Sequence, residues 1–175
     1  MKLTATGGYY GIGIECCKTW ANYGTLWRTA RILDASFVFL IGRKFKKTFT
    51  DPQSSWRVLP VYSYECFEDF YKNLPYSCVL IGIEMGETVQ QLEHFEHPER
   101  ACYLLGSENN GLSRKAIDHC HKKIKLRGEQ SMNVAVAGSI VMYDRVVKRT
   151  PIAKEIAINE RGPVEIIDSK LSSPL

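Results

Sequence analysis

The sequence has no long hydrophobic run. Its longest apolar stretches, Phe37–Ile41 and Val79–Ile83, are far too short to cross a bilayer, which takes about 20 apolar residues. The chain starts Met1-Lys2-Leu3 and then enters a glycine-rich stretch, without the apolar segment of a secretion signal. We therefore expect a cytoplasmic protein with no membrane segment.

The six cysteines include no Cys-x-x-Cys pair of the kind that holds zinc. Cys16 and Cys17 are adjacent, and the other four are single residues inside apolar or helical stretches. His119, Cys120 and His121 form a compact group of possible metal ligands, but adjacent residues on a helix point in different directions. We expect reduced thiols and no metal site.

The formal net charge of +4 is modest, but the basic residues are clustered. One loop holds Phe45 among four cations, Arg43, Lys44, Lys46 and Lys47. Such a loop suits an RNA backbone whose exposed bases stack on aromatic rings, and these cations are candidates for RNA binding. Solvated surface charge is the alternative, and charge by itself does not decide between the two.

Short apolar runs alternate with amphipathic segments along the chain. Strands are expected at 10–15, 37–41, 58–61, 77–83, 101–105 and 123–126, and helices at 23–33, 66–72, 112–120 and 133–147. A brief helix at most is expected at 88–94, and Asn22 is the expected N-cap of the helix at 23–33. The alternation predicts an α/β domain with a mainly parallel sheet.

The last expected helix is apolar on almost every side from Val134 to Met142. Such a helix must be covered all round, and a chain of this length holds one core. We therefore predict a homodimer that covers part of the helix, with a central core helix as the alternative. From residue 150 the composition changes to a proline-punctuated tail, so the predicted organisation is a domain at 1–149 and a tail at 150–175.

Gly7, Gly8, Gly11 and Gly13 invite a dinucleotide-binding interpretation. The Gly-x-Gly-x-x-Gly fingerprint follows the first strand and opens a helix, whereas these glycines precede and enter the strand. A nucleotide-binding oxidoreductase is therefore disfavoured.

Three linked motifs carry more information. The first is N-x-G-x-x-x-R-x-A at 22–30, the second is L-G-S-E-N-N-G-L-S at 105–113, and the third is S-M-N-V-A-V-A at 131–137. In this order they resemble the SpoU/TrmH branch of the SPOUT RNA methyltransferases, over residues 8–148. One departure is that residues 124–128 read I-K-L-R-G, where the family often has I-P-M-x-G.

The resemblance implies a single α/β-knot domain, with its C-terminal part threaded as a trefoil knot, and S-adenosyl-L-methionine as cofactor. Strand ends and a closing segment would bind the cofactor through Ile83, Glu84, Leu105, Gly106, Ser107, Ile124, Leu126, Met132 and Asn133. Gly106 would let the backbone approach the ligand closely. The implied reaction is methylation of a ribose 2′-hydroxyl, most simply of transfer RNA, or else of ribosomal RNA.

The resemblance also implies the catalytic residues Arg28, Asn22, Glu108, Asn133 and Ser131. Arg28 would hold phosphate and orient the hydroxyl because its guanidinium stays protonated, and action as a general base is the weaker alternative. Asn22 and Asn133 would position the ribose and the segment that carries Arg28. Glu108 would anchor the site by accepting hydrogen bonds, and Ser131 would line it. Two other classes stay open: an RNA-binding module without catalysis, and a base methyltransferase on the same fold.

Overall fold

A single parallel sheet organises the chain. The computed structural model describes residues 8–47, 50–52, 54–86 and 89–149, and within them seven strands pair in the order β3-β2-β1-β6-β4-β7-β5. The strands are β1 (Tyr9–Glu15), β2 (Phe37–Ile41), β3 (Val61–Tyr64), β4 (Val79–Ile83), β5 (Gln90–Gln91), β6 (Arg100–Leu105) and β7 (Lys122–Lys125). All their pairings are parallel, which confirms the predicted α/β class.

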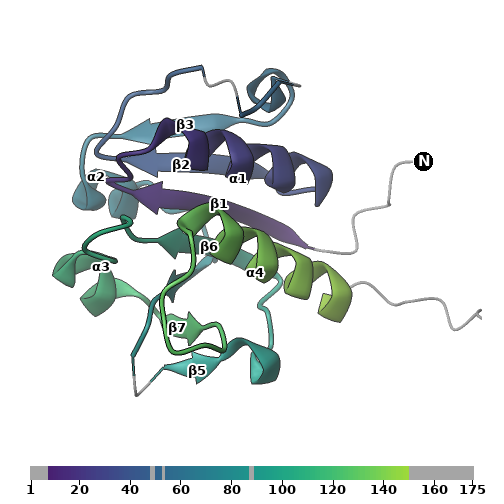
Figure 1. Ribbon diagram of the computed structural model, residues 1–175, viewed down its shortest axis with the longest axis vertical. Helices are drawn as coiled ribbons and strands as arrows, with labels where there is room; N and C mark the ends of the chain where they lie inside the picture. The colour runs from purple at the N-terminus through teal and green to yellow at the C-terminus, as the bar shows by residue number, and fades with distance from the viewer. Residues whose placement is uncertain (1–7, 48–49, 53, 87–88, 150–175) are drawn as a thin grey trace, which may run out of the picture.

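Helices cover both faces of the sheet (Figure 1). One face carries α1 (Trp20–Ile32) and α4 (Val134–Arg149), and the other carries α2 (Phe67–Lys72) and α3 (Arg114–His119). Two short 3₁₀ helices, η1 (Ser55–Arg57) and η2 (Leu92–His94), lie in the connections. Every residue of β2 is buried, as expected for a strand covered on both faces.

Two glycines of β1 are there for packing. A Cβ on Gly11 would lie 2.2 Å from the Phe37 ring, and one on Gly13 would lie 2.4 Å from the Phe39 ring. The bare strand thus admits two aromatic rings from β2, which belong to the core on the α2 and α3 face. This packing explains the glycines without any phosphate-binding loop.

Most predicted elements differ from the observed ones by one or two residues at an end, and three differ in a way that has a structural meaning. Helix α1 begins at Trp20 with Thr19 as its N-cap, so Asn22 lies inside the first turn, and its amide donates to Glu108. The strand predicted at 58–61 is β3, which starts only at Val61 because η1 precedes it. The start of η1 is held by two hydrogen bonds that Ser55 donates to the Asp51 carboxylate. Where a brief helix at most was expected at 88–94, Gln90–Gln91 form the strand β5 and Leu92–His94 form the 3₁₀ turn η2. The first two differences come from side-chain hydrogen bonds that override local propensity.

The cysteines and histidines are engaged separately. All six cysteines are free thiols. His119 Nδ1 lies 2.8 Å from the Lys115 carbonyl, whereas His121 Nδ1 accepts a hydrogen bond from the Leu80 amide. Among the described residues, no three His, Cys, Asp or Glu side chains are grouped to hold a metal ion.

Two further predictions concern a membrane segment and the C-terminal tail. Within the described ranges no helix combines the length and apolar character needed to cross a membrane. The tail predicted at 150–175 lies outside the described residues, so the boundary at 149 stays a prediction.

A buried polar network joins α4 to the start of β6. Arg145 is fully buried and donates to the Tyr103 hydroxyl at 3.0 Å and to the carbonyls of Pro98 at 2.7 Å and Glu99 at 2.8 Å. His97 bonds the same hydroxyl through Nδ1 and pairs with Asp144 through Nε2 at 2.8 Å. Burial lowers the pKa of His97 to about 4, although the Asp144 carboxylate acts in the opposite direction.

We expect this histidine to make the fold sensitive to mild acid. Its pKa is about 4 in the native state and 6.5 unperturbed, so the stability contributed by neutral His97 is present above pH 6.5 and is lost as the pH falls to 4. The loss is on the order of 3 kcal/mol. Denaturant unfolding of the wild type and of His97→Gln across this pH range checks the effect. The variant should show a flatter pH dependence, and an unchanged slope would contradict the assignment.

Candidate active site

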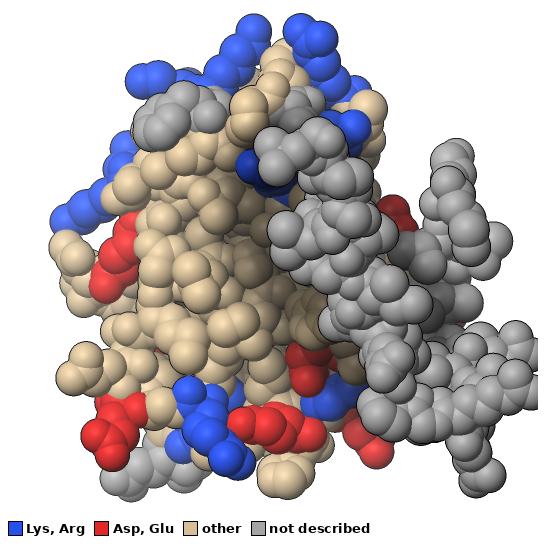
Figure 2. All heavy atoms as spheres, turned by 45° about the vertical axis from the view of Figure 1, so that its right-hand side comes forward, with Lys and Arg blue, Asp and Glu red and all other residues tan. Residues whose placement is uncertain are grey.

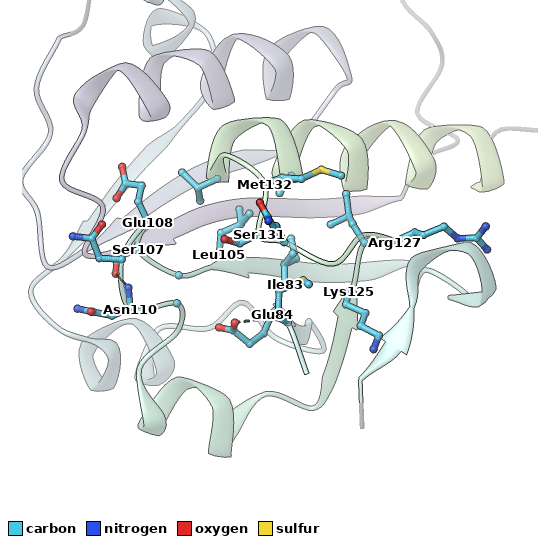
Figure 3. A pocket seen from close by; sticks show the side chains of 18 residues that line it. Ile83, Glu84, Leu105, Ser107, Glu108, Asn110, Lys125, Arg127, Ser131 and Met132 are labelled. Carbon is cyan, nitrogen blue, oxygen red and sulfur yellow. Dashed lines mark hydrogen bonds between the residues drawn. The ribbon is translucent and has the colours of Figure 1, made fainter. Parts of the chain in front are cut away.

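The carboxyl ends of β4, β6 and β7 open into a cavity of about 280 Å³ (Figure 3). In open α/β sheets ligands bind at this edge, and ligand pockets typically hold ~300–1,000 Å³. Most of the predicted cofactor residues line the cavity, namely Ile83, Glu84, Leu105, Gly106, Ser107, Leu126 and Met132. Two of the predicted catalytic residues, Glu108 and Ser131, lie at its rim.

The cavity combines an apolar floor with a polar rim. Leu105, Val134 and Ala137 are buried side chains that form the floor. Figure 3 shows Ser107 and Asn110 on one side of the cavity and Lys125 and Arg127 on the other. Such a pocket suits a flat heterocycle that buries its faces and hydrogen-bonds through its edge.

The loop between β6 and α3 has a tightly fixed shape. The amides of Ser107 and Gly111 each donate to the other's carbonyl at 3.0 Å. A Cβ on Gly106 would lie 1.9 Å from the carbonyl carbon of Gly111, so only glycine permits this hairpin. Glu84 accepts from the Leu112 amide at 2.8 Å and thereby ties the loop to the end of β4. The absence of a side chain at Gly106 therefore lets its backbone pack directly against the backbone of Gly111 and Leu112.

Glu108 links this loop to α1. Its carboxylate accepts hydrogen bonds from Asn22 Nδ2 at 2.7 Å, from the Cys17 thiol at 2.9 Å and from the amides of Lys18 at 3.2 Å and Thr19 at 3.3 Å. Burial acts to raise the pKa of Glu108, but these donors prevail and lower it to about 2. Glu108 is therefore ionised at neutral pH and acts as an acceptor only.

Asn22 and Asn133 extend the chain of hydrogen bonds to α4. Because Asn22 presents its NH₂ group to Glu108, its oxygen is left to accept from Asn133 Nδ2, at 3.0 Å. The Asn133 oxygen in turn accepts from the Ala135 amide at 2.9 Å and caps α4. The polar relay Glu108–Asn22–Asn133 thus brings all three sequence motifs together beside the cavity.

Several predicted residues lie elsewhere. Ile124 is fully buried in the core, and neither Ile124 nor Asn133 lines the cavity. Arg28 is exposed on α1, outside the cavity, and forms no ion pair or hydrogen bond with any described residue. It directly precedes Thr29, whose hydroxyl accepts a hydrogen bond of 3.1 Å from the Ser139 hydroxyl at the α1–α4 junction. A guanidinium without a partner among the described residues is available to a ligand.

Sequence reasoning missed Cys17 and about half of the residues that line the cavity. Cys17 is 1% exposed, and burial together with its bond to Glu108 raises the pKa of its thiol to about 12. Among the missed residues, Lys125 ends β7, and Arg127 and Gln130 lie in the segment that follows it. Cys17 and Glu108 are 91 residues apart, so no local pattern could pair them.

Fold and site together define a parallel α/β protein with a ligand pocket at the carboxyl edge of its sheet and a polar relay beside that pocket. The sequence pattern of the SpoU rRNA Methylase family matches residues 12–143. The chain belongs to this family, and the resemblance found from the motifs is confirmed. No curated protein sequence matches the chain.

Solved structures share the fold at low sequence identity. An AdoMet-bound rRNA methyltransferase from Sinorhizobium meliloti superposes with a TM-score of 0.69 at 18% identity, over 79% of this chain and 56% of that one. The TrmH/SpoU tRNA modifying enzyme of A. aeolicus gives 0.72 at 16% identity, over 80% and 75%. A structure concerned with 2-OH methylation of C/U34 on tRNA gives 0.68 at 20% identity, over 81% and 97%. The chain thus spans little more than half of the Sinorhizobium protein and nearly all of the last one.

Proposed function

We propose that the protein is an S-adenosyl-L-methionine-dependent methyltransferase that acts on a ribose 2′-hydroxyl of transfer RNA or ribosomal RNA. The observation that carries the proposal is the Glu108–Asn22–Asn133 relay, which joins the three family motifs beside one cavity. The structural relatives named for this chemistry support it through their shared fold.

The cavity fits the proposed cofactor. Its buried floor of Leu105, Val134 and Ala137 suits an adenine ring, and the backbone of the 106–111 hairpin offers polar groups for the edge of the ring. Ser131, Gln130 and Arg127 suit the ribose and the amino-acid portion. When bound, the cofactor supplies an electrophilic methyl group on a sulfonium.

The chain's own residues would position the acceptor. Arg28 is assigned to the RNA phosphate and to orientation of the 2′-hydroxyl, which its free guanidinium permits. Asn22 and Asn133 hold the start of α1 against the start of α4, and ionised Glu108 locks Asn22 in one orientation. Positioning of this kind can supply much of the rate enhancement.

One incubation tests the proposal. The purified protein is mixed with S-adenosylmethionine carrying a labelled methyl group and with total RNA, and the RNA is then digested to nucleosides. A labelled 2′-O-methylated nucleoside is the expected product. A base-methylated nucleoside would identify the other methyltransferase class instead.

Calorimetry distinguishes the proposed enzyme from an RNA-binding module without catalysis. Affinity for S-adenosylhomocysteine without any methyl transfer to RNA would favour a binding module that has lost catalysis. Well-folded protein that binds neither S-adenosylmethionine nor its demethylated product would refute the proposal.

We also propose that the protein is a homodimer built on α4. Although one side of α4 packs on the sheet, Val136, Ile140, Tyr143 and Val147 leave a stripe of apolar side chains 37–63% exposed. Figure 2 shows a broad area with few charged side chains on the face that includes the right-hand side of Figure 1. Such an unpaired apolar surface supports association with a second copy.

The dimer gives a direct prediction. The wild type should sediment as a dimer at micromolar concentration. The double variant Val136→Asp/Ile140→Asp should sediment as a folded monomer, because association would bury carboxylates that have no partner of opposite charge. Val58→Asp is the matched control, since Val58 is 65% exposed and lies away from α4, next to η1. A monomeric wild type, or a double variant that stays dimeric, would contradict the interface.

Three other expectations remain proposals. The C-terminal part would form the trefoil knot, which is supported by the position of β7 between β4 and β5, two strands that precede it in the chain. The methyltransferase domain would end near residue 149 and be followed by a tail. The free thiols support a reducing, cytoplasmic location.

A further inference from the structure

A second cavity lies on the same edge of the sheet as the first. It measures about 380 Å³ and is lined by Gly42, Arg43, Lys44, Ser63, Tyr64 and Glu65. These residues follow or end β2 and β3, which are held together there by a hydrogen bond from the Gly42 amide to the Tyr64 carbonyl. Since all strands are parallel, this cavity opens on the same side as the candidate active site.

The surface around the second cavity is strongly basic. Residues 42–60 contain five cations, Arg43, Lys44, Lys46, Lys47 and Arg57, and one carboxylate, Asp51. Asp51 is 4% exposed, and both its oxygens accept hydrogen bonds from Ser55. None of the five cations forms an ion pair with a carboxylate of the described part of the chain. Figure 2 shows Lys and Arg side chains gathered at the top of the molecule, where Figure 1 places the segment that joins β2 to β3.

Aromatic contacts hold this basic segment in place. Phe45 stacks on the buried Trp27 ring of α1 with centroids 5.5 Å apart, and Trp56 packs against Phe45 at 5.9 Å. Lys47 and Arg57 lie over the Trp56 ring at 5.0 Å and 5.3 Å. The rings that could have stacked on bases are therefore partly used inside the protein, and the cations are held on an anchored loop.

We propose that the second cavity is a subsite for a nucleotide of the same RNA strand that lies near, but not next to, the methylated one. Arg43 and Lys44 bind its phosphate, and the sugar and base lie against Ser63 and Tyr64. This inference rests on the proposed function and adds a defined path for the RNA. In the sheet order, β3 is three strands from β6, so the two cavities are separated by roughly 14 Å across the sheet.

The subsite assigns different roles to neighbouring cations. Arg43 and Lys44 line the cavity, whereas Lys46, Lys47 and Arg57 lie outside it. The three outer cations attract RNA by long-range electrostatics. Arg43 and Lys44 instead bind one phosphate at the second cavity. Glu65 is the one acidic residue of the lining, and it opposes the phosphate.

Fluorescence anisotropy with a labelled, mixed-sequence single-stranded RNA of about a dozen nucleotides tests the subsite. Arg43→Ala/Lys44→Ala should raise Kd at least tenfold and reduce the slope of log Kd against log salt by about 0.7, the value for one phosphate contact on a single strand. Ser63→Trp, which fills the cavity and leaves every cation in place, should also raise Kd about tenfold, since a tenfold change corresponds to one lost contact of ordinary strength. Glu65→Gln should tighten binding.

The control removes the same charge at the opposite edge. Lys72 ends α2 and Lys122 begins β7, so Lys72→Ala/Lys122→Ala changes two exposed cations at the amino ends of the strands. Equal weakening by this control, no effect of Ser63→Trp, or no RNA binding by the wild type would overturn the subsite. Calorimetry with S-adenosylhomocysteine is run on the wild type and on every variant. A wild type that does not bind S-adenosylhomocysteine refutes the proposed function. A variant that binds it normally but binds RNA differently shows that the change is confined to the subsite.

Discussion

Replacing Arg28 by alanine is expected to reduce methyl transfer to RNA at least 100-fold while leaving the fold and cofactor affinity unchanged. Removing one preorganised donor from an active site typically costs about 10²–10³ in rate. Arg28 is exposed, forms no ion pair or hydrogen bond with the described residues and does not line the cofactor cavity. The free energy of unfolding should therefore change by no more than about 0.5 kcal/mol. Single-turnover methyl transfer, thermal unfolding and calorimetry measure the three quantities.

Two further variants test whether the effect depends on the guanidinium group and on the position of Arg28. Arg28→Lys keeps the charge but loses the planar, two-pronged donor, so partial activity would indicate a point-charge role and strong loss would indicate oriented binding. Arg31→Ala removes another exposed arginine of the same helix and should retain most activity. Full turnover by Arg28→Ala would remove the role assigned to this side chain.

Replacing Gly106 by alanine should weaken cofactor binding at least tenfold and lower stability. The new Cβ would lie 1.9 Å from the carbonyl carbon of Gly111 and 2.1 Å from the Leu112 amide nitrogen, and both are backbone atoms that cannot rotate away. The hairpin must open, which also strains the bond from Leu112 to Glu84. Overpacking of this kind costs about 1–3 kcal/mol. Calorimetry with S-adenosylhomocysteine and denaturant unfolding give the two readouts.

Gly86→Ala is the matched control for Gly106→Ala. Among the described residues, a Cβ on Gly86 would meet only the Val89 side chain, at 3.1 Å, although Gly86 directly follows the cavity residue Met85. This variant should bind the cofactor product nearly as well as the wild type. If Gly106→Ala bound it equally well, the 106–111 hairpin would not form the cofactor site.

The sequence predicted the architecture well because most elements have strong local signals. The buried strands β2 and β4 are continuous apolar runs, as is β6 after Arg100, and α4 begins at Val134, one residue from the start expected for the last helix. Errors occurred where a tertiary contact decided the boundary. Asparagine is a residue type favoured at N-caps, so Asn22 was expected to cap the helix. Its side-chain amide instead donates a hydrogen bond to the carboxylate of Glu108, which is distant in sequence, and the helix starts earlier, at Trp20.

Buried polar groups were beyond the reach of sequence patterns. Arg145 occupies a position on α4 where an arginine would ordinarily face water, yet it is fully buried. The two terminal nitrogens of its guanidinium donate to the carbonyls of Pro98 and Glu99 and to the Tyr103 hydroxyl. These partners precede it by more than 40 residues, and no periodicity reveals them.

The amino-acid sequence by itself determined the parallel α/β class, the family and the three motifs, because hydrophobic periodicity and motif spacing are written along the chain. Only the tertiary structure decided how the motifs meet: the hydrogen-bonded relay of Glu108, Asn22 and Asn133, the burial of Cys17 beside it, and the second basic cavity at the ends of β2 and β3. The physical reason is that hydrogen bonds and cavities depend on which strand ends lie side by side, and the sheet order β3-β2-β1-β6-β4-β7-β5 is not the order of the chain.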